Sequence, residues 1–190
     1  MFHKTAIVII MCLALVLGVF AQAQAKDLAE LSAESAAYCK STAKAEPTSP
    51  DVIIAKVNEA SELLEKEGSA AFPKFKGNGS NFLFEGTYIW IHSLKDCQML
   101  MHPIKYKMEG NKYIGLKDKK GKRFFVAMSN LVKEKGSGWV EYYWPIPGTK
   151  KIVRKVSYVK RCKTADGLDV VLGCGIYNPS KEDLAKLDIH

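Results

Sequence analysis

The sequence predicts an α+β domain in which N-terminal helices pack on an antiparallel sheet. Three observations support this fold class. Apolar residues recur at helical spacing up to Gly68, they alternate at period two from Thr87 onward, and Gly- and Pro-rich turns separate the later segments. A set of helices followed mainly by strands is typical of the α+β class.

The chain of 190 residues begins with a segment typical of a secretory signal. Lys4 supplies the initial positive charge, Ala6 to Phe20 is apolar, and residues 21–25 offer A-x-A cleavage sites. The apolar run is shorter than the roughly 20 residues of a membrane-spanning helix. We therefore predict a signal peptide over residues 1–25 and a periplasmic or secreted protein with no membrane span after its removal.

Two helices are expected next. Residues 26–49 form an N-terminal helical segment, helical to about Lys44 and closed by a Pro-containing break. The second helix runs from Pro50 to about Lys66. Ser49 is a good N-cap, Pro50 suits the first helical position, and Gly68 ends the helix.

The rest of the chain reads mainly as strands and turns. Residues 69–85 are expected to be an irregular loop anchored by aromatic side chains, and Arg123 to Lys135 a short helix. Residues 179–190 form a polar tail with one helical turn from Ser180. The strands predicted from alternation are Thr87–His92, Gln98–His102, Trp139–Trp144, Ile152–Cys162 and Val170–Tyr177.

The charge excludes some functions and suggests others. The formal net charge is +8, with an acidic excess in residues 26–72 and a basic excess in residues 73–190. An exported protein rarely meets nucleic acid, so we expect no nucleic-acid partner. A basic body suits an anionic small ligand or an anionic membrane surface, whereas a solvated lysine-rich surface is the plainer interpretation. G-x-S-x-G and P-loop motifs are absent, so we expect neither catalysis nor a cofactor.

Several segments carry a family resemblance, and the most specific is the run Gly136–Pro145 that continues into Pro147–Thr149. The others are Thr87–Ile91, Met99–Lys105, Ser157–Arg161 and Gly173–Tyr177. In this order they resemble a single Cache domain, an extracellular sensing module related to PAS domains, over residues 50–178. Most relatives are ectodomains of chemoreceptors and kinases, and this chain resembles the rarer free-standing exported form.

The resemblance implies a PAS-like antiparallel sheet of five or six strands. It also implies a concave pocket for a small molecule, often a short carboxylate, an amino acid or an amine. The chain departs from the family pattern at Lys95–Cys97, where an Asp-Gly turn is usual, and at Cys174, where a small apolar residue is usual.

The predicted ligand site combines aromatic and cationic side chains on one face of the sheet. Alternation places Tyr142 and Trp144 on the same face, and Lys160 projects beside Tyr158. Core aromatics, and a Lys160 paired with Glu141 or solvent, are the alternative readings. The predicted ligand-binding residues are Tyr88, Trp90, His102, Tyr142, Trp144, Tyr158 and Lys160.

Four cysteines remain after signal removal, which is an even number in an oxidising compartment. We expect at least one disulfide. Cys97 at the first sheet turn and Cys162 at the end of the fourth strand are the favoured pair, leaving Cys39 for Cys174. The histidines lack zinc-ligand spacing, so no metal site is expected.

The leading functional hypothesis is an exported sensor-type module that captures a small organic ligand without catalysis. The expected ligand is a short carboxylate or an amino-acid-like compound, and an envelope sensor protein is a further candidate partner. The alternative is an envelope structural or interaction protein that binds another protein through its N-terminal helices.

Overall fold

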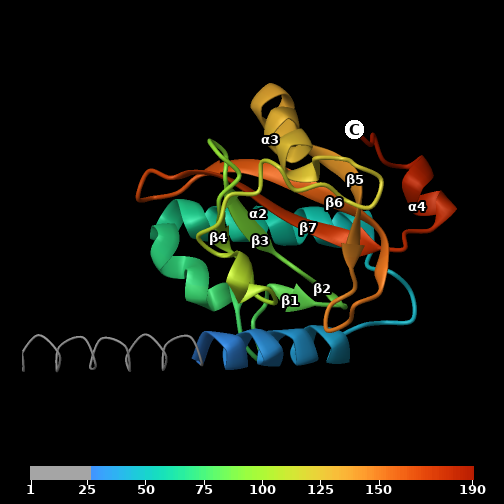
Figure 1. Ribbon diagram of the computed structural model, residues 1–190, viewed down its shortest axis with the longest axis horizontal. Coiled ribbons are helices and arrows are strands. Elements are labelled where there is room, and N and C mark those ends of the chain that lie inside the picture. Colours follow the sequence, from blue (N-terminus) through green and yellow to red (C-terminus); the bar gives the residue numbers. More distant parts are fainter. Residues whose placement is uncertain (1–26) are drawn as a thin grey trace, which may run out of the picture.

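The computed structural model describes residues 27–190, so the predicted signal peptide over residues 1–25 lies outside the described residues. The α+β prediction is confirmed. Five strands form one antiparallel sheet in the order β4-β3-β7-β6-β5 (Figure 1). Their bounds are β3 Trp90–Ser93, β4 Met99–Met101, β5 Ser137–Pro145, β6 Ile152–Lys163 and β7 Asp169–Tyr177. A second sheet pairs β1 Leu83–Phe84 with β2 Thr87–Tyr88.

The helices begin and end close to the predicted positions. The N-terminal helix is described over residues 27–41. Helix α2 spans Pro50–Glu67, where Ser49 Oγ accepts a hydrogen bond from the Val52 N–H at 3.4 Å. Gly68 ends this helix with a φ of 66°, a backbone conformation that glycine adopts at little cost. Helix α3 spans Phe124–Lys135, and the short α4 spans Lys181–Ala185.

Residues 69–85 are more ordered than the sequence predicted. The 3₁₀ helix η1 occupies Gly68–Phe75, and β1 lies within the same segment. The aromatic anchoring is present, since the rings of Phe75 and Phe82 stack with centroids 4.3 Å apart. A second 3₁₀ helix, η2, spans Tyr106–Met108.

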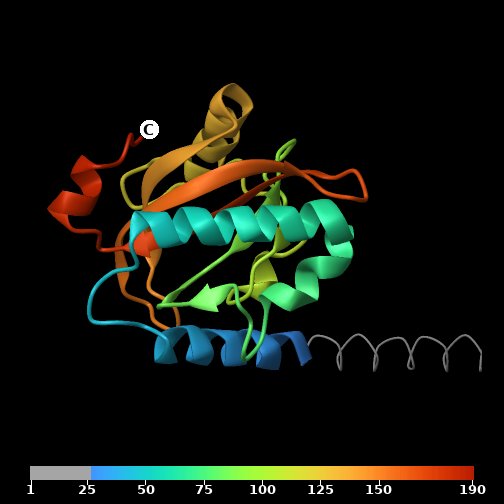
Figure 2. The same cartoon turned by 180° about the vertical axis from the view of Figure 1, so that it is seen from behind.

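Helices cover both faces of the main sheet and separate two cores. Helix α2 packs on β6 and β7 on one face (Figure 2), and α3 packs mainly on β5 on the other (Figure 1). The N-terminal helix lies beside the small β1–β2 sheet. The α2 side buries aliphatic residues such as Ile53 and Leu64, whereas the α3 side is rich in aromatic residues.

The strand register fixes which side chains share the aromatic face. Directly opposite residues of antiparallel strands point to the same face. Tyr142 of β5 pairs with Lys155 of β6, whereas Trp139 pairs with Tyr158. Lys155 therefore shares the α3-side face with Tyr142, and Tyr158 lies on the α2 side.

Candidate functional site

Five of the predicted site residues meet on the α3 side of the sheet. Tyr88, Trp90 and Tyr142 are buried in its core, and Trp144 packs against them. The Trp144 indole N–H donates to Tyr88 Oη at 2.9 Å, and the Tyr177 hydroxyl donates to the same oxygen at 3.4 Å. The rings of Tyr88 and His102 lie 5.0 Å apart.

His102 organises the loop that follows β4. Its Nδ1 accepts from the backbone N–H groups of Ile104 at 3.2 Å and Lys105 at 3.0 Å. Burial, and then the positive charges of Lys155 and Lys105, hold the pKa of His102 well below its usual value. The imidazole is therefore neutral and carries its proton on Nε2, because Nδ1 is the acceptor.

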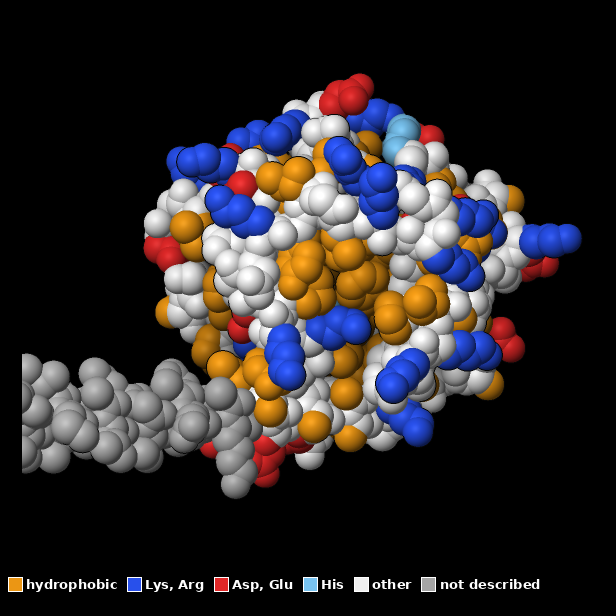
Figure 3. Space-filling model, in the orientation of Figure 1, with side chains coloured by type: hydrophobic (Ala, Val, Ile, Leu, Met, Phe, Trp, Pro, Cys, Tyr) orange, Lys and Arg blue, Asp and Glu red, His pale blue; other side chains and the backbone are white. Residues whose placement is uncertain are grey.

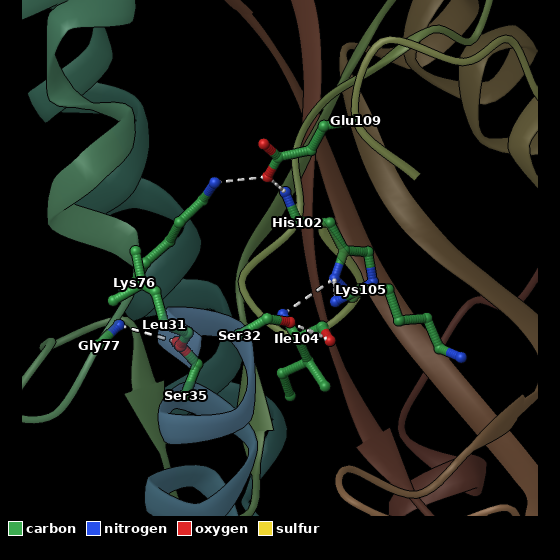
Figure 4. A network of polar contacts seen from close by, with 9 residues as sticks. All are labelled: Leu31, Ser32, Ser35, Lys76, Gly77, His102, Ile104, Lys105 and Glu109. Atoms are coloured by element: carbon green, nitrogen blue, oxygen red, sulfur yellow. Dashed lines mark hydrogen bonds and ion pairs between the residues drawn. The ribbon is translucent and has the colours of Figure 1, made fainter. Parts of the chain in front are cut away.

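A chain of polar contacts ties this loop to the N-terminal helix (Figure 4). The His102 N–H donates to Glu109 Oε1 at 2.7 Å, and Lys76 pairs with the same carboxylate at 2.6 Å. The Ser32 hydroxyl donates to the carbonyl of Ile104. One turn further along the helix, Ser35 Oγ accepts from the Gly77 N–H at 2.8 Å. The helix is thus fixed against the body of the domain on one side of the site.

A cavity of about 740 Å³ lies between the N-terminal helix, the η2 segment and the β5–β6 turn. Tyr88 and Trp144 line it, so it borders the aromatic cluster. Small side chains of the N-terminal helix, including Ala29 and Ala33, form one wall. In the orientation of Figure 1, apolar side chains gather in the middle of this face, with Lys and Arg side chains around them (Figure 3).

Lys155 is the cation that sequence reasoning missed. It is 0% exposed, and its Nζ lies 4.4 Å from the ring centroids of Tyr88 and Tyr177 and 4.9 Å from that of Trp90. Nζ donates to Tyr177 Oη at 3.1 Å. Within residues 27–190, no carboxylate is in ion-pair distance of it. Burial lowers the pKa of this ammonium group to about 8.

Two predicted site residues lie on the other face of the sheet. Tyr158 packs on Trp139, with ring centroids 5.4 Å apart, in the α2-side core. Lys160 Nζ donates to Asn58 Oδ1 of α2 at 3.0 Å. The prediction of one cavity lined by all seven residues is therefore wrong for these two. Of the other five, Tyr88 and Trp144 line the cavity of about 740 Å³, whereas Trp90, His102 and Tyr142 do not. Alternation along β6 correctly grouped Tyr158 with Lys160, but the pairing with β5 places both away from Tyr142.

The predicted Cys97–Cys162 disulfide is also not formed. Cys39, Cys97, Cys162 and Cys174 are all buried free thiols. Cys97 belongs to the α3-side core and Cys162 to the α2-side core, so the sheet separates the two side chains. Cys97 Sγ contacts Ser129 Oγ at 3.5 Å, whereas Cys162 Sγ donates to the Ser61 carbonyl at 3.7 Å.

The polar groups of this site can hold a ligand through hydrogen bonds. Among residues 27–190, no group of three or more His, Cys, Asp or Glu side chains is placed to hold a metal ion. The cluster contains two buried donors: the Lys155 ammonium, and the Trp90 indole N–H, which has no hydrogen-bond partner in the described part of the chain. Both groups can only donate. This arrangement suits a ligand that brings a hydrogen-bond acceptor or a negative charge.

Comparisons with known proteins identify relatives of the chain. A family profile described as a Cache domain matches residues 54–189. A solved structure described as the structural basis for carboxylic acid recognition by a Cache chemosensory domain is 32% identical, with a TM-score of 0.57. That match covers 67% of this chain and 92% of the other.

Two further relatives are chemotaxis proteins. The methyl-accepting chemotaxis protein McpP of Pseudomonas putida is 32% identical over 90 residues, which cover 47% of this chain and 16% of that protein. A methyl-accepting chemotaxis protein from Vibrio parahaemolyticus is 20% identical with a TM-score of 0.53, over 65% of this chain and 82% of the other. The second likeness concerns the fold alone. The chain thus matches only a small part of the curated relative's length.

Proposed function

The chain belongs to the Cache domain family, and from this premise we propose that it captures a small organic carboxylate reversibly and without catalysis. Its site would serve recognition alone, as in a sensor-type module. The related structure described for carboxylic acid recognition supports this ligand class. Sensor proteins of the envelope are the corresponding candidate partners.

The observation that carries the proposal is the buried ammonium group of Lys155. A buried charge is costly unless it is paired and hydrogen-bonded. Lys155 donates a hydrogen bond to Tyr177, and no carboxylate of the described residues lies within ion-pair distance of it. The aromatic rings around it compensate only part of the lost hydration. A ligand carboxylate would complete the pairing, and charge-assisted hydrogen bonds are the strong ones.

The cavity favours a carboxylate over an amine or an amino acid. Lys105, Lys107 and Lys150 line it, and its lining contains no Asp or Glu. A ligand ammonium group would therefore meet cations and find no carboxylate within the lining. The amino-acid-like ligand expected from sequence is accordingly the weaker candidate.

Export is part of the same proposal. We propose residues 1–25 as a signal peptide, residues 26–49 as the N-terminal helical segment, residues 50–178 as the Cache domain and residues 179–190 as the tail. In the described part of the chain, no helix is both long and apolar enough to cross a membrane. A mature protein in the periplasm or secreted would meet small ligands directly.

Replacing Lys155 with Met tests the proposal. The Met side chain keeps the apolar stem among the rings and removes the charge, so carboxylate binding should weaken by roughly 1.5–3 kcal/mol. The unliganded variant should be at least as stable as the wild type, because a desolvated cation is gone. Isothermal titration calorimetry after a thermal-shift screen of carboxylates, amino acids and amines measures both effects.

Lys160→Met is the matched control, because Lys160 lies on the same strand but on the α2 side. It should leave affinity unchanged. Equal affinity in Lys155→Met and the wild type would contradict the role of Lys155. No stabilisation by any compound, with an intact fold, would favour the alternative of an envelope protein that binds another protein through its N-terminal helices.

A further inference from the structure

We propose that the carboxylate ligand carries an extended apolar body, and that this body lies in the cavity between the N-terminal helix and the β5–β6 turn. The inference rests on the proposed function and narrows its ligand class. It departs from the short carboxylate that the sequence suggested.

The size of the cavity is the first argument. Its volume of about 740 Å³ is in the range of sites for drug-sized ligands, roughly 300–1,000 Å³. A single water molecule takes up roughly 30 Å³ of liquid, and an acid of two or three carbon atoms is only a few times larger. Such an acid would leave most of the cavity to solvent.

The chemistry of the walls is the second argument. Ala29, Ala33 and Ala36 of the N-terminal helix form one side, and Met108, Leu116 and Ile146 contribute apolar surface from the rest of the chain. Small helical side chains leave the space open. Apolar walls gain free energy by contacting an apolar ligand, whereas a small hydrated acid would gain nothing from them.

The direction of the ligand follows from the charges. Tyr88 and Trp144 border the cavity, and the Lys155 ammonium, which is not part of the lining, lies 4.4 Å from the centroid of the Tyr88 ring. The carboxylate end would therefore point toward Tyr88 and Lys155. The apolar body would extend from there between the helix and the β5–β6 turn. Lys105, Lys107 and Lys150 add positive charge to the lining, and Lys105 Nζ lies 5.3 Å from the Trp144 ring centroid.

The walls are held in place before any ligand arrives. The Ser32 hydroxyl joins the helix to the carbonyl of Ile104, and Ser35 holds it to Gly77 (Figure 4). His102 fixes the loop on the facing side through the backbone of Ile104 and Lys105. A preformed site loses less conformational entropy on binding, so the apolar contact contributes to affinity.

A series of unbranched carboxylates from acetate to decanoate tests the inference, with primary alcohols of matched length beside them. Affinity measured by calorimetry should rise about fourfold per added methylene, the factor that corresponds to ~0.8 kcal/mol per buried CH₂. The rise should stop when the cavity is filled. Each alcohol should bind more weakly than the acid of the same length.

A substitution in the helical wall provides a second test. Ala33→Leu keeps a strong helix former and fills part of the cavity, so it should reduce octanoate affinity more than acetate affinity. Ala37→Leu is the matched control, because Ala37 is exposed on the same helix and does not line the cavity. It should leave both affinities unchanged.

The outcomes separate this inference from the proposed function. If acetate or propionate binds in a Lys155-dependent way and longer acids bind no better, the inference is wrong and the proposed function stands. If no carboxylate of any length binds, the proposed function itself fails. Alcohols that bind as tightly as the acids, or an equal loss in Ala33→Leu and Ala37→Leu, would also overturn the inference.

Discussion

In the proposed binding mode, a single buried ammonium group, that of Lys155, links ligand recognition to protonation. Its folded-state pKa of about 8 lies below the value of about 10.4 for an unperturbed lysine, because burial disfavours the charged form. Between these two pH values the unfolded chain binds more protons than the folded chain. Lys155 taken alone therefore makes the unliganded protein more stable as the pH rises from about 8 to about 10. The raised pKa values of the buried Cys39 and Cys174 thiols act in the opposite direction over this range. The rise should therefore appear in urea denaturation as a difference in the free energy of unfolding between the wild type and Lys155→Met.

Carboxylate binding should show the opposite pH dependence. The bound anion needs the charged form of Lys155, so affinity should be highest below pH 8 and should fall by up to about tenfold per pH unit above it. Titration calorimetry with propionate or octanoate between pH 6.5 and 9.5 measures this. Lys155→Met should lose the dependence. A wild-type affinity that stays constant across this range would contradict the assignment.

The position of Lys155 on the aromatic face of the sheet could not be predicted from the sequence. Alternation along β6 separates its residues into two sets, and each set contains a lysine: Lys155 with Ser157, and Lys160 with Tyr158. The sequence of β6 alone does not determine which of the two sets faces the aromatic cluster. The pairing of Lys155 with Tyr142 decides it, and this pairing depends on the turn between β5 and β6.

At the scale of the element, two glycines of β7 allow the side chains of Trp90 and Lys155 to lie close to the backbone of this strand. A Cβ at Gly173 would lie 2.7 Å from the Trp90 ring, and a Cβ at Gly175 would lie 2.6 Å from Lys155 Cε. Neither distance is acceptable for a real Cβ. The glycines of the Gly173–Tyr177 motif are therefore needed for the close approach of the aromatic and cationic side chains to the strand.

Gly175→Ala should consequently displace Lys155 and Ser157. We expect a loss of about 1–3 kcal/mol in the free energy of unfolding, as for other overpacked sites, together with weaker carboxylate binding. Urea denaturation and calorimetry measure the two effects. Gly115→Ala is the control, since a Cβ there meets nothing within 4 Å. Wild-type stability and affinity in Gly175→Ala would contradict the prediction that a Cβ at this position displaces Lys155 and Ser157.

The elements themselves were predictable to the extent that their signals are local. Ser49, Pro50 and Gly68 define the ends of α2 within a residue of the structure. Four of the five predicted strands were recovered from alternation with small errors at their ends. The predicted strand Thr87–His92 is instead divided into β2 of the small sheet and β3 of the main sheet. The η1 helix was missed, because Pro73 and the nearby glycines also suit an irregular loop and the packing of Phe75 on Phe82 is a tertiary contact.

On the scale of the whole molecule, the N-terminal helix is an integral part of the domain. It lies outside the residues matched by the family profile, yet it supplies a cavity wall and buries Cys39 in the α3-side core. Cys39 Sγ donates to the Thr87 carbonyl at 3.3 Å, and Thr87 Oγ1 contacts Cys174 Sγ at 3.4 Å. The disulfide prediction from the number of cysteines did not account for the positions of the side chains: the sheet separates Cys97 from Cys162, and Cys39 and Cys174 are free thiols on either side of Thr87.

Thiol labelling as a function of denaturant tests this integration. Burial raises the pKa of Cys39 to about 12 and that of Cys174 to about 11, so neither should react with an alkylating reagent at pH 8 in the native protein. If the helix and sheet unfold together, both thiols should become reactive at the same urea concentration. Mass spectrometry of pulse-labelled peptides resolves each site. Labelling of Cys39 at lower urea would show that the helix detaches first. Recovery of fewer than four alkylated thiols (Cys39, Cys97, Cys162 and Cys174) from unreduced, unfolded protein would instead reveal a disulfide, in contradiction to the four free thiols of this structure.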